Sequence, residues 1–183
     1  MNSFYSRDEL MQLGFKCVGE DVKISKKASI YGADKISIGD HSRIDDFCIL
    51  SGKITIGRYV HISAYTALYG GATGIEFCDY SGISARGTVY AESDDFSGRH
   101  MTNSTLPDEV RGVIAAPVTI SRFCQIGAGC VVLPGSYLEE GVAVGSMSLI
   151  KKRLREWTIC AGVPCKKIKD REKNILELEK SVK

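Results

Sequence analysis

A six-residue step repeats through most of this chain and constrains its fold more than any other feature. Four segments of 18 residues align with one another, beginning at Ile36, Ile54, Ile75 and Val118. Each has an aliphatic or phenylalanine anchor at its third, ninth and fifteenth positions, and a last, shorter segment continues the pattern. The anchors are Ile38, Ile44, Leu50, Ile56, Ile62, Leu68, Phe77, Ile83, Val89, Ile120, Ile126, Val132, Leu138, Val144 and Ile150.

The residues two positions before many anchors are small, which sharpens the prediction. Three six-residue steps make one turn of a triangular parallel β-solenoid, with an anchor pointing inward from each flat side. Successive turns then stack at about the β-strand spacing, ~4.8 Å. Ile24 and Ile30 begin the pattern two residues out of phase. The small inward positions are Ser42, Cys48, Thr66, Ser81, Cys124 and Cys130.

The seven cysteines fit this interpretation better than a redox or metal role. Their number is odd and no C-x-x-C pair occurs, which argues against a disulfide framework or a zinc ribbon. We expect Cys48, Cys124 and Cys130 to serve as small apolar core residues.

The two ends and one interruption depart from the repeat. Ser6 and Glu9 form a capping-box pattern, so a short helix to about Leu13 is expected within an N-terminal cap over residues 1–17. A C-terminal helix is expected over 168–183, as a cap or a trimer contact. Ile120 follows Val89 by 31 positions where six would suffice, which predicts a polar loop protruding over 91–117. A smaller insertion covers 72–74.

Composition places the chain in a broad class. Its 183 residues predict a single domain, and a net charge of +2 gives no reason to expect nucleic-acid binding. No apolar run reaches membrane-spanning length, and the N-terminus resembles neither a signal peptide nor an anchor. A cytoplasmic location is therefore expected.

The repeat, joined to two longer stretches, resembles a known enzyme family. The [LIV]-G-x4 steps, "IGAGCVVLPGSYLEEGVAVGSMSLI" and "AGVPCKKI" resemble the hexapeptide-repeat acyltransferases, and most of all the bacterial galactoside and polysaccharide O-acetyltransferases. The resemblance covers about residues 20–170. It implies an all-β fold, the left-handed parallel β-helix, as well as a homotrimer, acetyl-CoA as co-substrate and no metal.

The function expected from this resemblance is acetyl transfer from acetyl-CoA to a sugar hydroxyl, in surface-polysaccharide or nucleotide-sugar metabolism. N-acetylation of an amino sugar is an alternative, because it needs the same base and the same groove. A trimeric scaffold or binding module without catalysis is another, although a pure scaffold has little reason to keep a long polar loop. A γ-type carbonic anhydrase is disfavoured because His41, His61 and His100 are 20 and 39 residues apart. The acceptor sugar and the length of the acyl group stay open.

The catalytic base is the least settled part of this prediction. Family members carry a histidine just after the strand that enters the long loop, and here Asp94 stands in that place. His41 falls on a turn, whereas His61 precedes an anchor and so points outward. We therefore expect His61 or His100 to act as base, with Asp94 or Asp95 orienting it. An inactive enzyme is the remaining alternative.

The other candidate residues follow from the resemblance and from the loop. Asp95 and Asn103 of the loop, with Tyr65, are expected to bind the acceptor. Small residues that let a pantetheine arm approach the backbone, and a basic segment near the C-terminus, are expected to bind acetyl-CoA. The expected co-substrate residues are Gln125, Gly127, Ala128, Gly145, Ser146, Ala161, Pro164 and Lys166.

Overall fold

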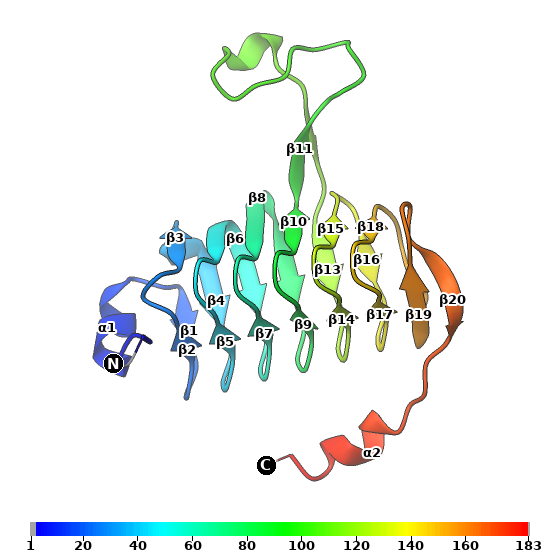
Figure 1. Cartoon of the computed structure of the whole chain (residues 1–183). Coiled ribbons are helices and arrows are strands. Elements are labelled where there is room, and N and C mark those ends of the chain that lie inside the picture. The colour runs from blue at the N-terminus through cyan, green and yellow to red at the C-terminus, as the bar shows by residue number, and fades with distance from the viewer. Residues whose placement is uncertain (1–2, 183) are drawn as a thin grey trace.

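The chain forms a triangular solenoid from which one loop projects (Figure 1). The computed structural model describes residues 3–182. Parallel strands stack coil upon coil along the solenoid axis, so the all-β parallel β-helix predicted from the six-residue period is confirmed. None of the helices in this part of the chain is long and apolar enough to cross a membrane.

The flat side that carries the ninth-position anchors, here the second side, is an eight-stranded sheet. Strand pairing places Arg43, His61, Gly82, Gln125 and Ala143 in one outward-facing column, as the alignment of the repeats predicts. The strands, in order, are β2 (Lys23–Ile24), β5 (Arg43–Ile44), β7 (His61–Ile62), β9 (Gly82–Ile83), β14 (Gln125–Ile126), β17 (Ala143–Val144), β19 (Thr158–Ala161) and β20 (Lys166–Asp170).

The first and third sides join into one ten-stranded sheet, because two long strands bend around the corner between them. The smaller insertion, 72–74, lies within one of these long strands and shifts the pairing from Gly52↔Gly71 to Ile54↔Ile75. The long strands are β6 (Ile49–Ile56) and β8 (Ala67–Phe77). The first side adds β1 (Cys17–Val18), β4 (Ile36–Ile38), β13 (Val118–Ile120) and β16 (Tyr137–Leu138), and the third adds β3 (Ser29–Tyr31), β10 (Thr88–Tyr90), β15 (Val131–Val132) and β18 (Leu149–Ile150).

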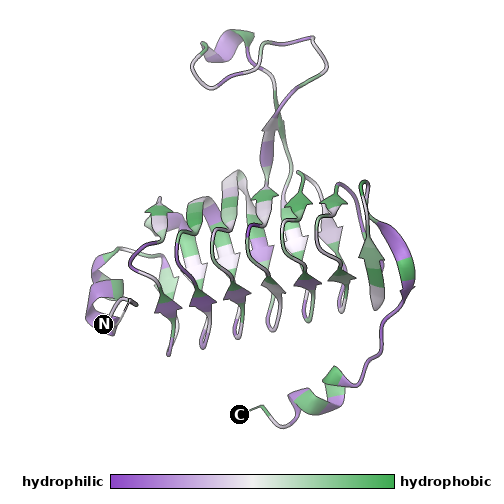
Figure 2. Cartoon of the chain, in the orientation of Figure 1, coloured by the Kyte–Doolittle hydropathy of each residue, from purple (hydrophilic) through white to green (hydrophobic). Residues whose placement is uncertain are grey.

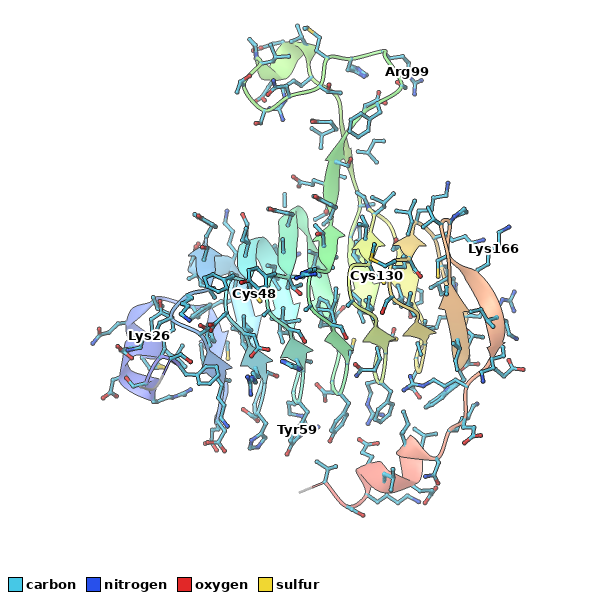
Figure 3. The ribbon with its side chains drawn as sticks, in the orientation of Figure 1. Lys26, Cys48, Tyr59, Arg99, Cys130 and Lys166 are labelled. Atoms are coloured by element: carbon cyan, nitrogen blue, oxygen red, sulfur yellow. The ribbon has the colours of Figure 1, made fainter. Side chains whose placement is uncertain are left out.

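The core is the stack of predicted anchors. All fifteen are buried, and Val144, at 5% exposed, is the most open of them. Hydrophobic and hydrophilic residues alternate along the strands in Figure 2, as expected for a pleated wall with one dry face. Cys48 and Cys130 lie inside the body in Figure 3, and Cys124 is buried as well. Burial raises the pKa of the Cys48 thiol to about 11 and that of Cys124 to about 12, so these thiols are inert core residues.

The corner between the first and second sides carries a stack of rings. His41, Tyr59, Tyr80, Phe123 and Trp157 occupy equivalent turn positions, each with φ between 51° and 59°. Their ring centroids are 4.7, 5.2, 5.3 and 6.2 Å apart in that order. A positive φ is unfavourable for residues with a side chain, and stacking of ~0.5–1.5 kcal/mol per ring pair offsets part of that cost. His41 is therefore a turn residue, as expected.

The short N-terminal helix is as predicted. Helix α1 (Arg7–Gln12) begins at Ser6, whose hydroxyl accepts a hydrogen bond from the Glu9 amide while the Glu9 carboxylate accepts one from the Ser6 amide. Leu10 is buried against the first coil, so this helix closes the open end of the core.

A C-terminal helix is present, as predicted, but it is much shorter than the expected range of 168–183. Residues Lys166–Asp170 form β20, which pairs antiparallel with β19, and only α2 (Ile175–Glu179) is helical. The last coil would otherwise present an unpaired strand edge, and β20 supplies the hydrogen-bonding partner for that edge. Ile168, the first residue of the predicted helix, lies in β20 and is exposed. Arg171 then fastens the segment by donating from Nη1 to the carbonyls of Phe123 at 2.7 Å and Gly141 at 3.0 Å.

The protruding loop is structured rather than featureless. It leaves the corner between the third and first sides as a two-stranded antiparallel ribbon of β11 (Glu92–Asp94) and β12 (Val113–Ala115), and a 3₁₀ turn, η2 (Asp108–Val110), lies in its outer part. A second 3₁₀ turn, η1 (Ala33–Lys35), occupies the first coil. In Figure 1 the loop points away from the solenoid, and Figure 3 shows Arg99 at its outer end.

Candidate active site

The cleft at the base of the loop brings a carboxylate and a guanidinium together. It has a volume of about 510 Å³. One part is polar and the other apolar, so it suits a ligand with both kinds of surface. Its lining residues are Tyr90, Glu92, Ser93, Asp94, Phe96, Arg111, Val113 and Leu133.

Asp94 is the last residue of β11. It faces Arg111, which lies two residues before β12 begins. Asp94 Oδ1 and Arg111 Nη2 are 4.0 Å apart, which is close enough for an ion pair but too long for a hydrogen bond. The Asp94 side chain is 31% exposed, so its carboxylate is accessible from the cleft. Glu92, two residues earlier on the same strand, accepts a hydrogen bond from the Ala72 amide at 2.7 Å. Of the two carboxylates, Asp94 is the one left open to a ligand.

The loop contains a histidine–carboxylate pair, and of the two expected carboxylates, Asp94 and Asp95, the one that pairs with His100 is Asp95. His100 Nδ1 lies 3.0 Å from Asp95 Oδ2. The Ser97 amide donates to Asp95 Oδ1 at 2.8 Å and the Ser97 hydroxyl to Oδ2 at 2.9 Å. His100 first, and then these two bonds, lower the pKa of Asp95 to about 2. Asp95 is thus a hub that ties the loop to itself, which gives it a structural role alongside the acceptor-binding role predicted for it.

His61 forms a second pair that sequence reasoning missed. Its Nε2 lies 2.8 Å from Asp45 Oδ2, and Asp45 Oδ1 also accepts a hydrogen bond from Arg43 Nε at 2.6 Å. Asp45 lies one turn below His61 and two positions beyond Arg43, so the column alignment was the signal that could have found it.

The small residues expected to hold the co-substrate line up along the corner between the second and third sides. The Gly127 amide donates to the Val144 carbonyl and the Gly145 amide to the Cys160 carbonyl, both at 2.8 Å, which stacks Gly127, Gly145 and Ala161. Ala128 and Ser146 follow in the same turns. Ser84 lies one coil below Gly127, since its amide bonds the Ile126 carbonyl. Gly127 also has a packing reason, because a Cβ there would meet the Ser146 amide at 2.5 Å.

Three of the remaining predicted residues are not among those that line the cleft at the base of the loop. The Gln125 Nε2 donates to the Tyr80 carbonyl at 3.3 Å, and its side chain lies beside α2. Tyr65 is exposed on the same corner as Gly127 and stacks on Phe47, with ring centroids 4.9 Å apart. Asn103 Oδ1 accepts two hydrogen bonds from Thr105, both at 3.1 Å, which makes it a turn residue of the loop.

The last two predicted residues lie at the C-terminal end of the solenoid. Lys166 begins β20 and pairs with Ala161, and Figure 3 shows its side chain on that outer edge. Pro164 lies in the preceding turn, after a cis peptide bond. A cleft of about 310 Å³ next to Lys166 is strongly basic. Its cationic lining residues are Lys152, Arg153, Arg155, Lys166 and Lys167.

The predicted catalytic set does not converge within one chain. His61 lies on the second side, whereas Asp94 and His100 belong to the loop, which leaves the solenoid at a different corner and points away from it (Figure 1). His100 pairs with Asp95 and not with Asp94. Across residues 3–182, no three His, Cys, Asp or Glu side chains are grouped so that they could hold a metal ion.

Comparison with known proteins identifies the family. No protein-family model matches the chain. The dTDP-4-amino-4,6-dideoxy-D-glucose acyltransferase of Escherichia coli is 42% identical over 174 residues, which cover 93% of this chain and 90% of that protein. The chain belongs to the hexapeptide-repeat sugar acyltransferases. The expected enzyme class is therefore confirmed.

Solved relatives agree with this assignment. AntD, an N-acyltransferase from Bacillus cereus, is 52% identical to this chain. The alignment covers 98% of this chain and 97% of the AntD chain, and the two structures superpose with a TM-score of 0.97. Its structures hold dTDP with coenzyme A, or dTDP with 3-hydroxybutyryl-CoA, and include variants of its Asp94 and Ser84. This chain also has Ser84 and Asp94 at those numbers. A putative lipopolysaccharide biosynthesis O-acetyl transferase of Escherichia coli K12 is 27% identical over 153 residues.

Proposed function

We propose that this acyltransferase transfers an acyl group from acyl-CoA to the 4-amino group of dTDP-4-amino-4,6-dideoxyglucose or a close relative of that sugar. The observation that carries the proposal is the similarity to AntD over nearly the whole chain, together with Ser84 and Asp94 at matching numbers. It favours the N-acyl alternative over the O-acetyl transfer expected from the repeat motifs. We place the reaction in the cytoplasm, where acyl-CoA thioesters are available.

The proposed chemistry is direct transfer. The amine nitrogen attacks the thioester carbonyl carbon, a C–N bond forms, and the C–S bond breaks to release the CoA thiolate. Asp94 accepts the proton that the nitrogen loses, and that proton returns to the thiolate sulfur. An amine is a better nucleophile than a hydroxyl, so a carboxylate is a sufficient base and the histidine of O-acetyltransferases can be absent. His61 and His100 remain candidates from the sequence, and the experiment below separates His61 from Asp94.

The proposed site lies between subunits of a homotrimer. Ser84 and Asp94 stand at opposite ends of β10, on two different corners of the same coil. No hydrogen bond involves the Ser84 hydroxyl within the described chain, and this side chain is exposed. We assign it to the thioester carbonyl oxygen or the acceptor amine. A loop that projects from one subunit and a small-residue column on the next subunit supply the two halves of such a site.

The test is product formation by purified protein. dTDP-4-amino-4,6-dideoxyglucose is incubated with acetyl-CoA or 3-hydroxybutyryl-CoA and analysed by mass spectrometry, with dTDP-6-deoxyglucose as the matched hydroxyl control. Acylation of the amino sugar alone is expected. Asp94→Asn should lower kcat by ~10²–10⁴-fold, the range for a general base, while His61→Ala keeps most activity. An active Asp94→Asn and an inactive His61→Ala would reverse the base assignment.

O-acyl transfer is the second candidate, and the 27% identical O-acetyl transferase favours it. The products differ chemically, because an ester is cleaved by mild alkali and an amide is not. An alkali-labile product from the hydroxyl control would establish O-transfer and contradict the proposal.

A further inference from the structure

Arg111 is a nearly buried cation with few partners. Its side chain is 19% exposed, and of its five N–H donors only one Nη1 hydrogen makes a hydrogen bond to the protein, to Asp108 Oδ1 at 2.9 Å. Nη2 stops 4.0 Å from Asp94. Nε is buried and has no partner, and among residues 3–182 it is the one buried side-chain nitrogen or oxygen in that state.

The partner that Arg111 does have is a weak one. Asp108 is 94% exposed, and an ion pair with so exposed a carboxylate contributes little. A partly buried guanidinium with a buried and unpartnered Nε is costly and calls for an explanation, such as a ligand that engages the group. Arg111 lines the same cleft as Asp94, so a ligand in that cleft can contact its guanidinium group.

The chemistry of a guanidinium indicates which ligand would complete it. Its planar fork of donors matches the oxygens of a phosphate, with two parallel N–H···O bonds. Glu92 does not compete for Arg111 because its carboxylate is engaged by the Ala72 amide. Asp94 is near, but it lies too far for a hydrogen bond, so Nη2 stays available.

We infer that Arg111 binds the diphosphate of the nucleotide-sugar acceptor, and this inference rests on the function proposed above. The acceptor carries a negative diphosphate and, before it reacts, an amine that can be positive. Arg111 and Asp94 offer the complementary pair of charges within one cleft. The bound diphosphate offsets the positive charge of Arg111, which would otherwise repel the ammonium form of the amine as it approaches Asp94. Arg111 thereby orients the acceptor nitrogen toward the base.

The experiment compares two variants and three ligands by calorimetry. Arg111→Met removes the donors and keeps the apolar stem, and Asp108→Asn removes the same ion pair from its other side. The ligands are dTDP, thymidine and coenzyme A, with inorganic pyrophosphate as a probe of the anion site alone. Arg111→Met is expected to weaken dTDP and pyrophosphate by ~10–100-fold, the range for charge-assisted hydrogen bonds, and to leave thymidine and coenzyme A unchanged. Asp108→Asn should bind dTDP at least as tightly as wild type.

Three results would overturn the inference. The first is unchanged dTDP affinity in Arg111→Met. The second is a loss of coenzyme A affinity instead, which would assign Arg111 to the donor. The third is an equal loss in Asp108→Asn, which would make the ion pair a fold element of the loop. If wild-type protein binds neither dTDP nor pyrophosphate, this inference and the proposed acceptor both fall; if only the variants disagree, the acceptor stands.

Discussion

The solenoid body and the loop over 91–117 are stabilised by different kinds of contact. In the body, aliphatic anchors such as Ile62 and Leu68 are fully buried and stack coil upon coil. In the loop, apolar side chains such as Phe96 and Ile114 are exposed, at 82% and 54%, and the ordering contacts are polar bonds around Asp95. Apolar burial is cooperative along a solenoid, whereas a few exposed hydrogen bonds hold only their own segment.

Because of this difference, most contacts that stabilise the fold lie in the body, whereas the proposed base lies on the loop. Changes in the loop should leave the free energy of unfolding of the body nearly unchanged, while changes in the core should affect every coil. The proposed base, Asp94, stands where the two regions meet, on a ribbon fixed by the body at one end. A rigid scaffold carrying a variable loop is a common arrangement for binding and catalysis.

The largest expected effect is on the core. Ile62→Ala should lower the free energy of unfolding by ~2–5 kcal/mol, because it leaves a cavity in the centre of the stack. The matched loop change, Val113→Ala, removes methyl groups from a half-exposed side chain and should cost less than ~0.5 kcal/mol. Urea unfolding followed by circular dichroism measures both. Similar losses for the two variants would show that the loop contributes to the same cooperative unit.

A smaller, local effect is expected from Asp95→Ala. This change removes the acceptor for Ser97 and His100 and should speed hydrogen exchange of loop amides by roughly three- to tenfold, the factor for one or two ordinary hydrogen bonds. Exchange in the body should not change. Thr105→Ala, at another polar turn of the loop, is the control. Faster exchange at β14 would contradict the separation of the two regions.

The smallest of these effects is expected from acid. Loop order should not change near neutral pH and should decrease only below pH 4. The pKa of Asp95 is lowered from 3.8 to about 2, so its contribution is fully present above 3.8 and is lost as the pH falls through about 2. The exchange rate of the Ser97 amide, corrected for the intrinsic pH dependence, should stay flat from pH 7 to pH 5 and rise between pH 4 and pH 2. In Asp95→Asn that rise should disappear. A rise already at pH 6 would assign the loop order to another group.

The solenoid was predictable because its period is carried by the residues themselves. Each anchor must fill one position of a narrow core, so the anchors from Ile38 to Ile150 recur every six residues except at the two insertions, and all are buried in the structure. For the C-terminal segment, residue spacing predicted a longer helix than the one that forms. Ile168 and Ile175 lie at helical spacing, but the need of β19 for a partner at the end of the sheet is a tertiary effect that spacing does not record.

The site was predictable only in part. The family resemblance drew attention to Asp94 and to the small-residue column of Gly127 and Gly145. The repeat alignment placed Asp45 one turn below His61 but did not show that their side chains meet, and the pairing of Arg111 with Asp108 depends on side-chain direction within a folded loop. A repeat alignment gives the column of a residue but not the rotamer of a long side chain, so Arg111 carried no signal in the sequence.

The neck of the loop has a consequence for engineering. The chain leaves the solenoid at Ala91 and returns at Ala116, and the Ala116 amide donates to the Ala91 carbonyl at 3.0 Å. Val118 then resumes the stack directly above Ile75, as though no residues intervened. The segment between the two alanines is thus a cassette with a closed base. On the function proposed above, transplanting this segment between relatives should exchange acceptor preference without any redesign of the coils that carry it.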